Sequence, residues 1–211
     1  EGQNREAFKL INSLSSAGIP ILILIYITIA FTFRSFSQPI LLFCLMPVSL
    51  IGVAWGHWIH GFPVNILSLL GVIALVGIMV NDGLVLIGKF NNNLKQNFNF
   101  NEGLIDAGKS RFRAIFLTTA TTVAGLTPLL LEKSRQAQWL KPMAISVSYG
   151  IAFATILTLI LLPIFISLNN DLKVIFKWLV SGDYPDKEVV ERAIIEKKEE
   201  QKMDQINNTE N

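Results

Sequence analysis

Long apolar stretches separated by short polar links divide most of the chain into segments of membrane length. A helix needs about 20 apolar residues to cross the hydrocarbon core, and it satisfies all its backbone groups internally. The pattern therefore predicts an all-α integral membrane protein, a bundle of about five transmembrane helices between residues 17 and 168. The expected spans are residues 17–33, 39–58, 64–88, 115–131 and 142–168.

Two shorter segments place apolar side chains at helical spacing among charged ones. Residues 102–112 and 172–179 have this pattern, which is typical of short helices lying in the membrane interface. Pro185 is expected to end the second segment, and Asp186 to cap a charged helix from about residue 187. The tail loses its apolar face beyond Ile195, so we expect it to be solvated and partly disordered.

The basic residues predict the orientation. The link between the third and fourth spans has more Lys and Arg than the link between the fourth and fifth, and cytoplasmic links carry this excess. We therefore expect residues 1–16 to be the end of a periplasmic segment, and residues 169–211 to be a cytoplasmic interfacial helix and charged tail. The polar start of the chain resembles the interior of a longer polypeptide.

Composition narrows the function. The chain is 51% hydrophobic and only 16% charged, whereas soluble domains average about 25% charged residues. A net charge of +2 is too small to indicate nucleic acid binding. No metal-ligand spacing, nucleophile triad or phosphate-binding loop is present, so we expect neither an enzyme nor a cofactor. His57 and His60 belong to a short aromatic turn and favour interface anchoring over metal binding.

Asp82 is the most informative residue, because it lies inside the third span. A carboxylate at this depth costs several kcal/mol unless it is paired, hydrated or protonated. It can therefore be a proton-exchanging group, or a packing residue bonded to a neighbouring hydroxyl. Asn81 precedes it and projects about 100° away around the helix. Asn81 shares a stripe with small residues that permit close helix approach: Gly71, Ala74, Gly77 and Gly88.

The fourth span is rich in threonine. Thr118, Thr122 and Gly125 share one helix face by their spacing. Threonine hydroxyls inside membranes often bond back to their own helix backbone. The same hydroxyls can also donate to Asp82 or line a chain of water molecules. The spacing alone does not decide between a structural and a functional role.

Several segments together resemble a known family. They are Gly77-Ile-Met-Val-Asn-Asp-Gly-Leu-Val-Leu86, Arg111-Phe-Arg113, Ile115-Phe-Leu-Thr-Thr119 and Ala124-Gly-Leu-Thr-Pro128. In order and spacing they resemble the C-terminal membrane half of resistance-nodulation-division (RND) efflux permeases, in the hydrophobe/amphiphile branch. Arg34-Ser-Phe-Ser-Gln-Pro39 resembles the family's link between the first two of these spans.

The resemblance implies the last five spans of a twelve-span, multi-pass transporter of the bacterial inner membrane. It implies proton-driven antiport of drugs or amphiphiles, a homotrimer, and contacts with the N-terminal half, a periplasmic adaptor and an outer-membrane channel. Thr118 matches the family's relay threonine and Arg111 its cytoplasmic-side arginine. Asn81 occupies a position where the best-known branch has lysine, which puts that branch's lysine switch in doubt and leaves Asp82 as the ionisable residue.

The leading interpretation is thus the C-terminal membrane part of a proton-driven efflux transporter, with a proton relay formed by Asp82, Asn81, Thr118 and Arg111. One alternative is a structural or assembly membrane protein in which Asp82 only holds helices together. Another is a related proton-driven exporter of lipids or secretion factor.

Overall fold

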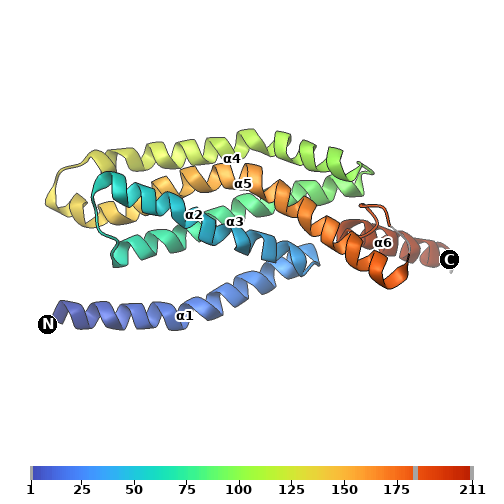
Figure 1. Cartoon of the computed structure of the whole chain (residues 1–211), viewed down its shortest axis with the longest axis horizontal. Coiled ribbons are helices and arrows are strands. Elements are labelled where there is room, and N and C mark those ends of the chain that lie inside the picture. Colours follow the sequence, from blue (N-terminus) through green and yellow to red (C-terminus); the bar gives the residue numbers. More distant parts are fainter. Residues whose placement is uncertain (1, 183–184, 210–211) are drawn as a thin grey trace.

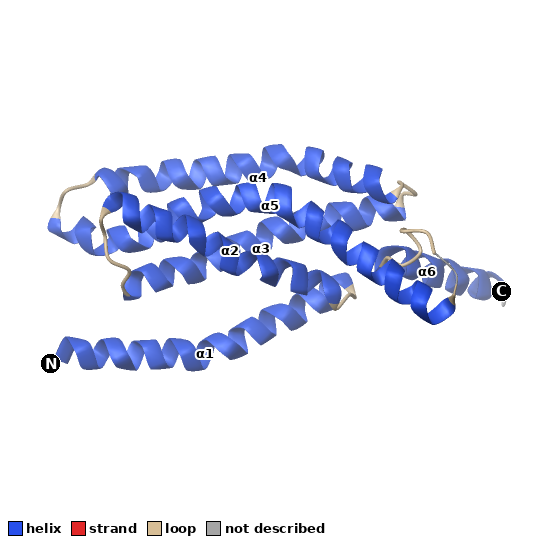
Figure 2. Ribbon diagram, viewed as in Figure 1, coloured by secondary structure: helices blue, strands red, loops and turns tan. Residues whose placement is uncertain are grey.

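The computed structural model describes residues 2–182 and 185–209, and this part of the chain consists of helices and short links without a strand (Figures 1 and 2). The predicted all-α fold is confirmed. The helices are α1 (Gly2–Phe33), α2 (Ser37–His60), α3 (Ile66–Lys95), α4 (Phe100–Leu131), α5 (Arg135–Ser181) and α6 (Arg192–Thr209).

Four helices are long and apolar enough to cross a membrane: α2, α3, α4 and residues 135–180 of α5. Residues 18–33 of α1 form a shorter apolar helical stretch, which is the fifth candidate. Helices α1 to α5 run in alternating directions, so the α1–α2 and α3–α4 links lie at the same end as α6 (Figure 1). We call this the α6 end. The start of α1 and the α2–α3 and α4–α5 links lie at the opposite end.

Helix ends follow local chemistry. Asn65 accepts a hydrogen bond from the amide of Ser68, and the Ser68 hydroxyl accepts one from the amide of Asn65, which forms a capping box at the start of α3. Gly182 ends α5 with a φ of 76°, in the left-handed region that glycine adopts without penalty. The prediction that Pro185 ends this helix is therefore wrong.

Two expected interfacial helices are continuous with the spans beside them. Residues 102–112 form the first part of α4, and residues 172–179 form the last part of α5. Neither glycine nor proline separates them from the apolar runs, so nothing in the backbone interrupts the helix. With 47 residues α5 is about 70 Å long, more than twice the thickness of the hydrocarbon core.

The charged tail is also more ordered than expected. The chain forms α6 from Arg192, and its first turn packs against the bundle, where Ala193 is buried and Ile194 contacts the core. The prediction of a solvated tail is wrong for this first turn, whereas residues 198–203, beyond Ile195, are exposed as expected. The ion pairs described below supply the contacts that an apolar face would otherwise have to make.

Helix α5 is the centre of the bundle and packs against α2, α3 and α4. A Cβ atom at Gly71 of α3 would lie 2.7 Å from the backbone oxygen of Met143 on α5, so only glycine permits this approach. The histidines also join α2 to α5. Buried His57 bonds through Nε2 to the Ser146 hydroxyl at 3.0 Å, and Nε2 of His60 lies 3.0 Å from the Tyr149 hydroxyl. Both histidines thus hold α2 against α5, and they also belong to the aromatic last turn of α2.

Candidate functional site

Asp82 lies on the buried face of α3. Its residue exposure is 6%, and the residues one turn before and after it, Met79 and Leu86, are buried hydrophobics. No residue in the described part of the chain donates a hydrogen bond to its carboxyl group or forms an ion pair with it. An unpaired carboxylate in apolar surroundings is costly, so these neighbours favour protonation or hydration of the group.

Asn81 points away from this buried face. It is exposed, as are Ala74 and Gly77 on the same stripe. The surroundings of the stripe differ along the helix. Gly71 contacts α5, and a Cβ atom added at Gly88 would lie 3.8 Å from the Phe33 ring. At Gly77 an added Cβ would meet no atom within 4 Å. The Asn81 part of the stripe is therefore open in this chain.

Thr118 is exposed on α4, and its hydroxyl donates to the backbone oxygen of Ala114 at 2.8 Å. The residue that connects α4 to its neighbour is Thr119, which is buried and hydrogen-bonds to Thr155 of α5. The family motif predicts Thr118 as the functional residue and does not indicate Thr119. The sequence carries no signal that separates the two, because Ala114 and Thr118 have the same spacing as Ile115 and Thr119.

Arg111 is half-buried in the first half of α4, and its Nε is buried without a hydrogen-bond partner in the described structure. A buried donor without a partner costs about 1–3 kcal/mol. None of the four predicted relay residues is hydrogen-bonded to another among the described residues. The structure therefore separates them: Asp82 faces inward, while Asn81 and Thr118 face outward.

The outward face of α4 also exposes polar side chains. The most apolar part of α4 is the least buried of the four spans. Thr121 and Thr127 are exposed and bond to their own helix backbone, and an added Cβ at Gly125 would have open space around it. Exposed apolar side chains, among them Phe116 and Leu117, lie on the same helix.

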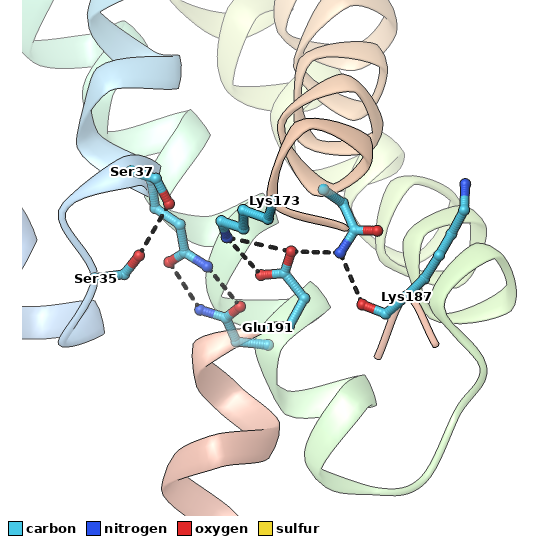
Figure 3. Close-up of polar contacts among 8 residues, drawn as sticks. Ser35, Ser37, Lys173, Lys187 and Glu191 are labelled. Carbon is cyan, nitrogen blue, oxygen red and sulfur yellow. Dashed lines mark hydrogen bonds and ion pairs between the residues drawn. The ribbon is translucent and has the colours of Figure 1, made fainter. Parts of the chain in front are cut away.

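A second polar region, at the α6 end, pairs its buried carboxylate with side chains of the described part of the chain. Glu191 is 2% exposed and accepts hydrogen bonds from Asn170 at 2.7 Å and from Lys173 at 3.1 Å, both on α5 (Figure 3). Asn170 also donates to the backbone oxygen of Lys187. The link before α6 is thus fastened to the end of α5.

Glu196 connects α6, on which it lies, to the end of α1 and the end of α3. Its two carboxylate oxygens lie 2.8 Å from Arg34, after α1, and 2.8 Å from Lys95, at the end of α3. The hydrogen bond from Lys95 and the nearby cationic charges lower the pKa of Glu196 below its ordinary value. Lys197 adds hydrogen bonds to the Lys95 backbone oxygen and to the Asn97 side chain. The α6 end is an ionic clasp formed by α1, α3, α5 and α6.

Four membrane-length helices, with the buried carboxyl group of Asp82 on one of them, define the described part of the chain as a polytopic membrane protein. Residues 1–169 match the AcrB/AcrD/AcrF family, and the chain belongs to this family of RND permeases. The chain therefore corresponds to a membrane part of the RND efflux pump family.

Individual relatives differ in the process that their names describe. The chain is 28% identical over 152 residues to the swarming motility protein SwrC of Bacillus subtilis, which covers 72% of this chain and 14% of SwrC. It is 27% identical over 143 residues to the cobalt-zinc-cadmium resistance protein CzcA of Cupriavidus metallidurans, covering 68% of this chain and 14% of CzcA. The chain thus spans about one seventh of these relatives.

A solved structure agrees with the fold. The crystal structure of a heavy metal efflux pump aligns with a TM-score of 0.69 and 25% identity, covering 79% of this chain and 16% of the pump. The RND family is confirmed by these matches. The hydrophobe/amphiphile branch is not confirmed by them, since a metal resistance protein and a metal pump are among the similar proteins.

Proposed function

We propose that this chain is the C-terminal membrane part of a proton-driven efflux transporter of the bacterial inner membrane, with its C-terminus in the cytoplasm. Asp82 carries the proton, Asn81 is its polar neighbour, Thr118 is a relay hydroxyl and Arg111 lies at the cytoplasmic mouth. The observation that carries the proposal is the buried Asp82 carboxyl group, which has no described partner. A packing carboxylate would instead have a hydroxyl or amide bound to it.

The outward direction of Asn81 and Thr118 supports a second part of the proposal. These side chains need a facing polar surface, and the open backbone at Gly77 and Gly125 leaves room for another helix to approach. The N-terminal half of the same transporter is the proposed partner. By family resemblance, the complete protein forms a homotrimer that contacts a periplasmic adaptor and an outer-membrane channel.

For the cargo we propose drugs or other amphiphiles, with heavy-metal cations as the second candidate. The second is favoured by the similarity to CzcA and to the heavy metal pump structure. Among the described residues no group of three or more His, Cys, Asp or Glu side chains is placed to hold a metal ion. Either cargo would then be selected by parts of the transporter beyond the described residues.

The test is Asp82→Asn in the intact transporter. Asparagine keeps the size and hydrogen-bonding capacity of aspartate but cannot exchange a proton. We expect transport driven by a pH gradient in proteoliposomes to be abolished, while thermal stability is unchanged or higher, because a neutral amide is cheaper to bury. Asp106→Asn is the control, since Asp106 is a half-exposed carboxylate paired with Lys89.

Transport at the wild-type level by the Asp82→Asn protein would show that Asp82 is structural. Parallel assays with an amphiphilic dye and with zinc and cobalt ions would separate the two cargo classes. Transport of a cation but not of the dye would favour heavy-metal cations over amphiphiles as the cargo. The proposed role of Asp82 would not change.

A further inference from the structure

A groove of about 300 Å³ lies at the α6 end, between α1, the start of α2 and the first turn of α6. Its lining combines aromatic and aliphatic side chains with two cationic groups. Phe31 and Phe36 are 79% and 77% exposed, so no other part of the described chain covers its apolar side. The main lining residues are Tyr26, Ile27, Phe31, Arg34, Phe36 and Arg192.

The position of the groove along α1 is that of a membrane interface. The apolar stretch of residues 18–33 ends directly at Arg34. Phe31 precedes Arg34 by one turn and Ile27 by two, so they lie at the depth of acyl chains when the arginine lies at headgroup level. The Tyr26 hydroxyl donates to the Phe36 backbone oxygen at 2.9 Å and fixes the two sides of the groove to each other.

The charges around the groove leave a cationic excess. Arg34 Nη1 lies 2.8 Å from Glu196, which also binds Lys95 at 2.8 Å, and Arg192 Nη2 lies 3.6 Å from Glu199. Three cationic side chains thus face two carboxylates. Each guanidinium has five N–H donors, so a single carboxylate contact leaves donors for a second anionic ligand.

We propose that this groove binds an anionic phospholipid from the leaflet at the α6 end. The headgroup phosphate is held between Arg34 and Arg192, and an acyl chain lies along Ile27 and Phe31. Basic pockets between membrane helices are suited to anionic headgroups, and planar guanidinium groups match phosphate oxygens. A free phosphate ion would leave the apolar half of the groove unused, which is why a lipid is the better occupant. This binding is separate from proton coupling at Asp82.

The test places a reporter in the groove of the intact protein. Phe36→Trp is reconstituted in phosphatidylcholine vesicles, and its fluorescence, after subtraction of the unsubstituted protein, is titrated with brominated phosphatidylglycerol. Brominated phosphatidylcholine is the matched neutral probe. We expect quenching to saturate at a low mole fraction of the anionic lipid only.

Arg192→Gln should weaken this binding about fivefold, the change expected for one arginine near an anionic surface. This variant keeps the Arg34–Glu196 ion pair, so folding can be preserved and checked by size-exclusion profile. Arg34→Gln should weaken binding similarly, and Arg34→Lys should lose less. Arg113→Gln removes a charge that does not line the groove and should change nothing.

Three outcomes would overturn the proposal. Equal quenching by both lipids, unaffected by Arg192→Gln, means that only annular lipid is present. Absence of quenching by either lipid means that protein covers the groove. Loss of quenching when inorganic phosphate is added at millimolar concentration means that the site takes a free anion and has no lipid preference.

Discussion

The two polar regions of this molecule differ in how their buried charges are satisfied. At the α6 end, Glu191 is 2% exposed and accepts hydrogen bonds from both Asn170 and Lys173. In the membrane core, Asp82 is 6% exposed and has no partner among the described residues. Breaking a satisfied buried ion pair is costly, whereas an unsatisfied carboxyl group becomes neutral or acquires water. Among the described residues, the buried carboxylate of the clasp is paired and that of Asp82 is not.

The difference also appears in the helix surfaces. The clasp draws residues from α1, α3, α5 and α6, so its partners are fixed by the tertiary fold. Near the membrane site, Asn81 and Thr118 are exposed. The stabilising contacts and the residues proposed for transport thus lie in different places, and substitutions should separate their effects.

The largest expected effect breaks the clasp. Glu191→Ala removes the acceptor of two donors and should destabilise the docking of α6 by about 3 kcal/mol, since removing one partner of a buried pair leaves the other unsatisfied. Hydrogen exchange of the α6 backbone amides measures the loss. Asp171→Ala is the control, because the Asp171–Lys187 pair is well exposed and such pairs contribute about 0–1 kcal/mol. Equal exchange in both variants would contradict a buried clasp.

A second pair of variants compares the covered and open parts of the α3 stripe. Gly71→Ala would place Cβ 2.7 Å from the Met143 backbone oxygen and should lower the stability of the bundle by about 2 kcal/mol. Gly77→Ala meets no atom within 4 Å in this chain and should leave bundle stability intact. Thermal unfolding tests both. If another half packs on the open face, Gly77→Ala should instead weaken co-purification of separately expressed halves, and unchanged co-purification would argue against that contact.

Neighbouring threonines separate stability from transport. Thr119→Ala removes the buried hydrogen bond to Thr155 and should cost about 1 kcal/mol of stability. Thr118→Ala loses only a bond to its own helix backbone, so stability should be unchanged. In the intact transporter Thr118→Ala should reduce transport partially, because a water molecule can replace a relay hydroxyl. If stability were lost in Thr118→Ala and kept in Thr119→Ala, Thr118 and not Thr119 would lie on the inward face of α4.

The smallest expected effect concerns pH at the clasp. The pKa of Glu196 is lowered by Lys95 and Arg34, so its contribution is complete above the ordinary value of 4.5 and is lost as pH falls through the lowered pKa. The contribution should be below about 1 kcal/mol, since Arg34 is mostly exposed. Hydrogen exchange of α6, compared between the native chain and Glu196→Gln over this pH range, measures it. A difference that grows as pH falls would reverse the assigned sign.

Sequence patterns were sufficient for the all-α fold and its membrane-length apolar helices, because hydropathy and helix length are local properties. They were insufficient at helix junctions: residues 102–112 and 172–179 have the amphipathic pattern of separate interfacial helices, yet both continue into spans. Periodicity identifies helical conformation but does not mark a boundary where no breaker residue is present.

The sequence by itself determined that Asp82 is an ionisable group inside a membrane helix, and that threonines line the fourth span. Only the tertiary structure decided which threonine is buried, which half of the glycine stripe is open, and that the charged tail docks on the bundle. The physical reason is that facing depends on the rotation of each helix against its neighbours. Glu196 binds Arg34 and Lys95, residues far from it in the sequence, and no local pattern records such a contact.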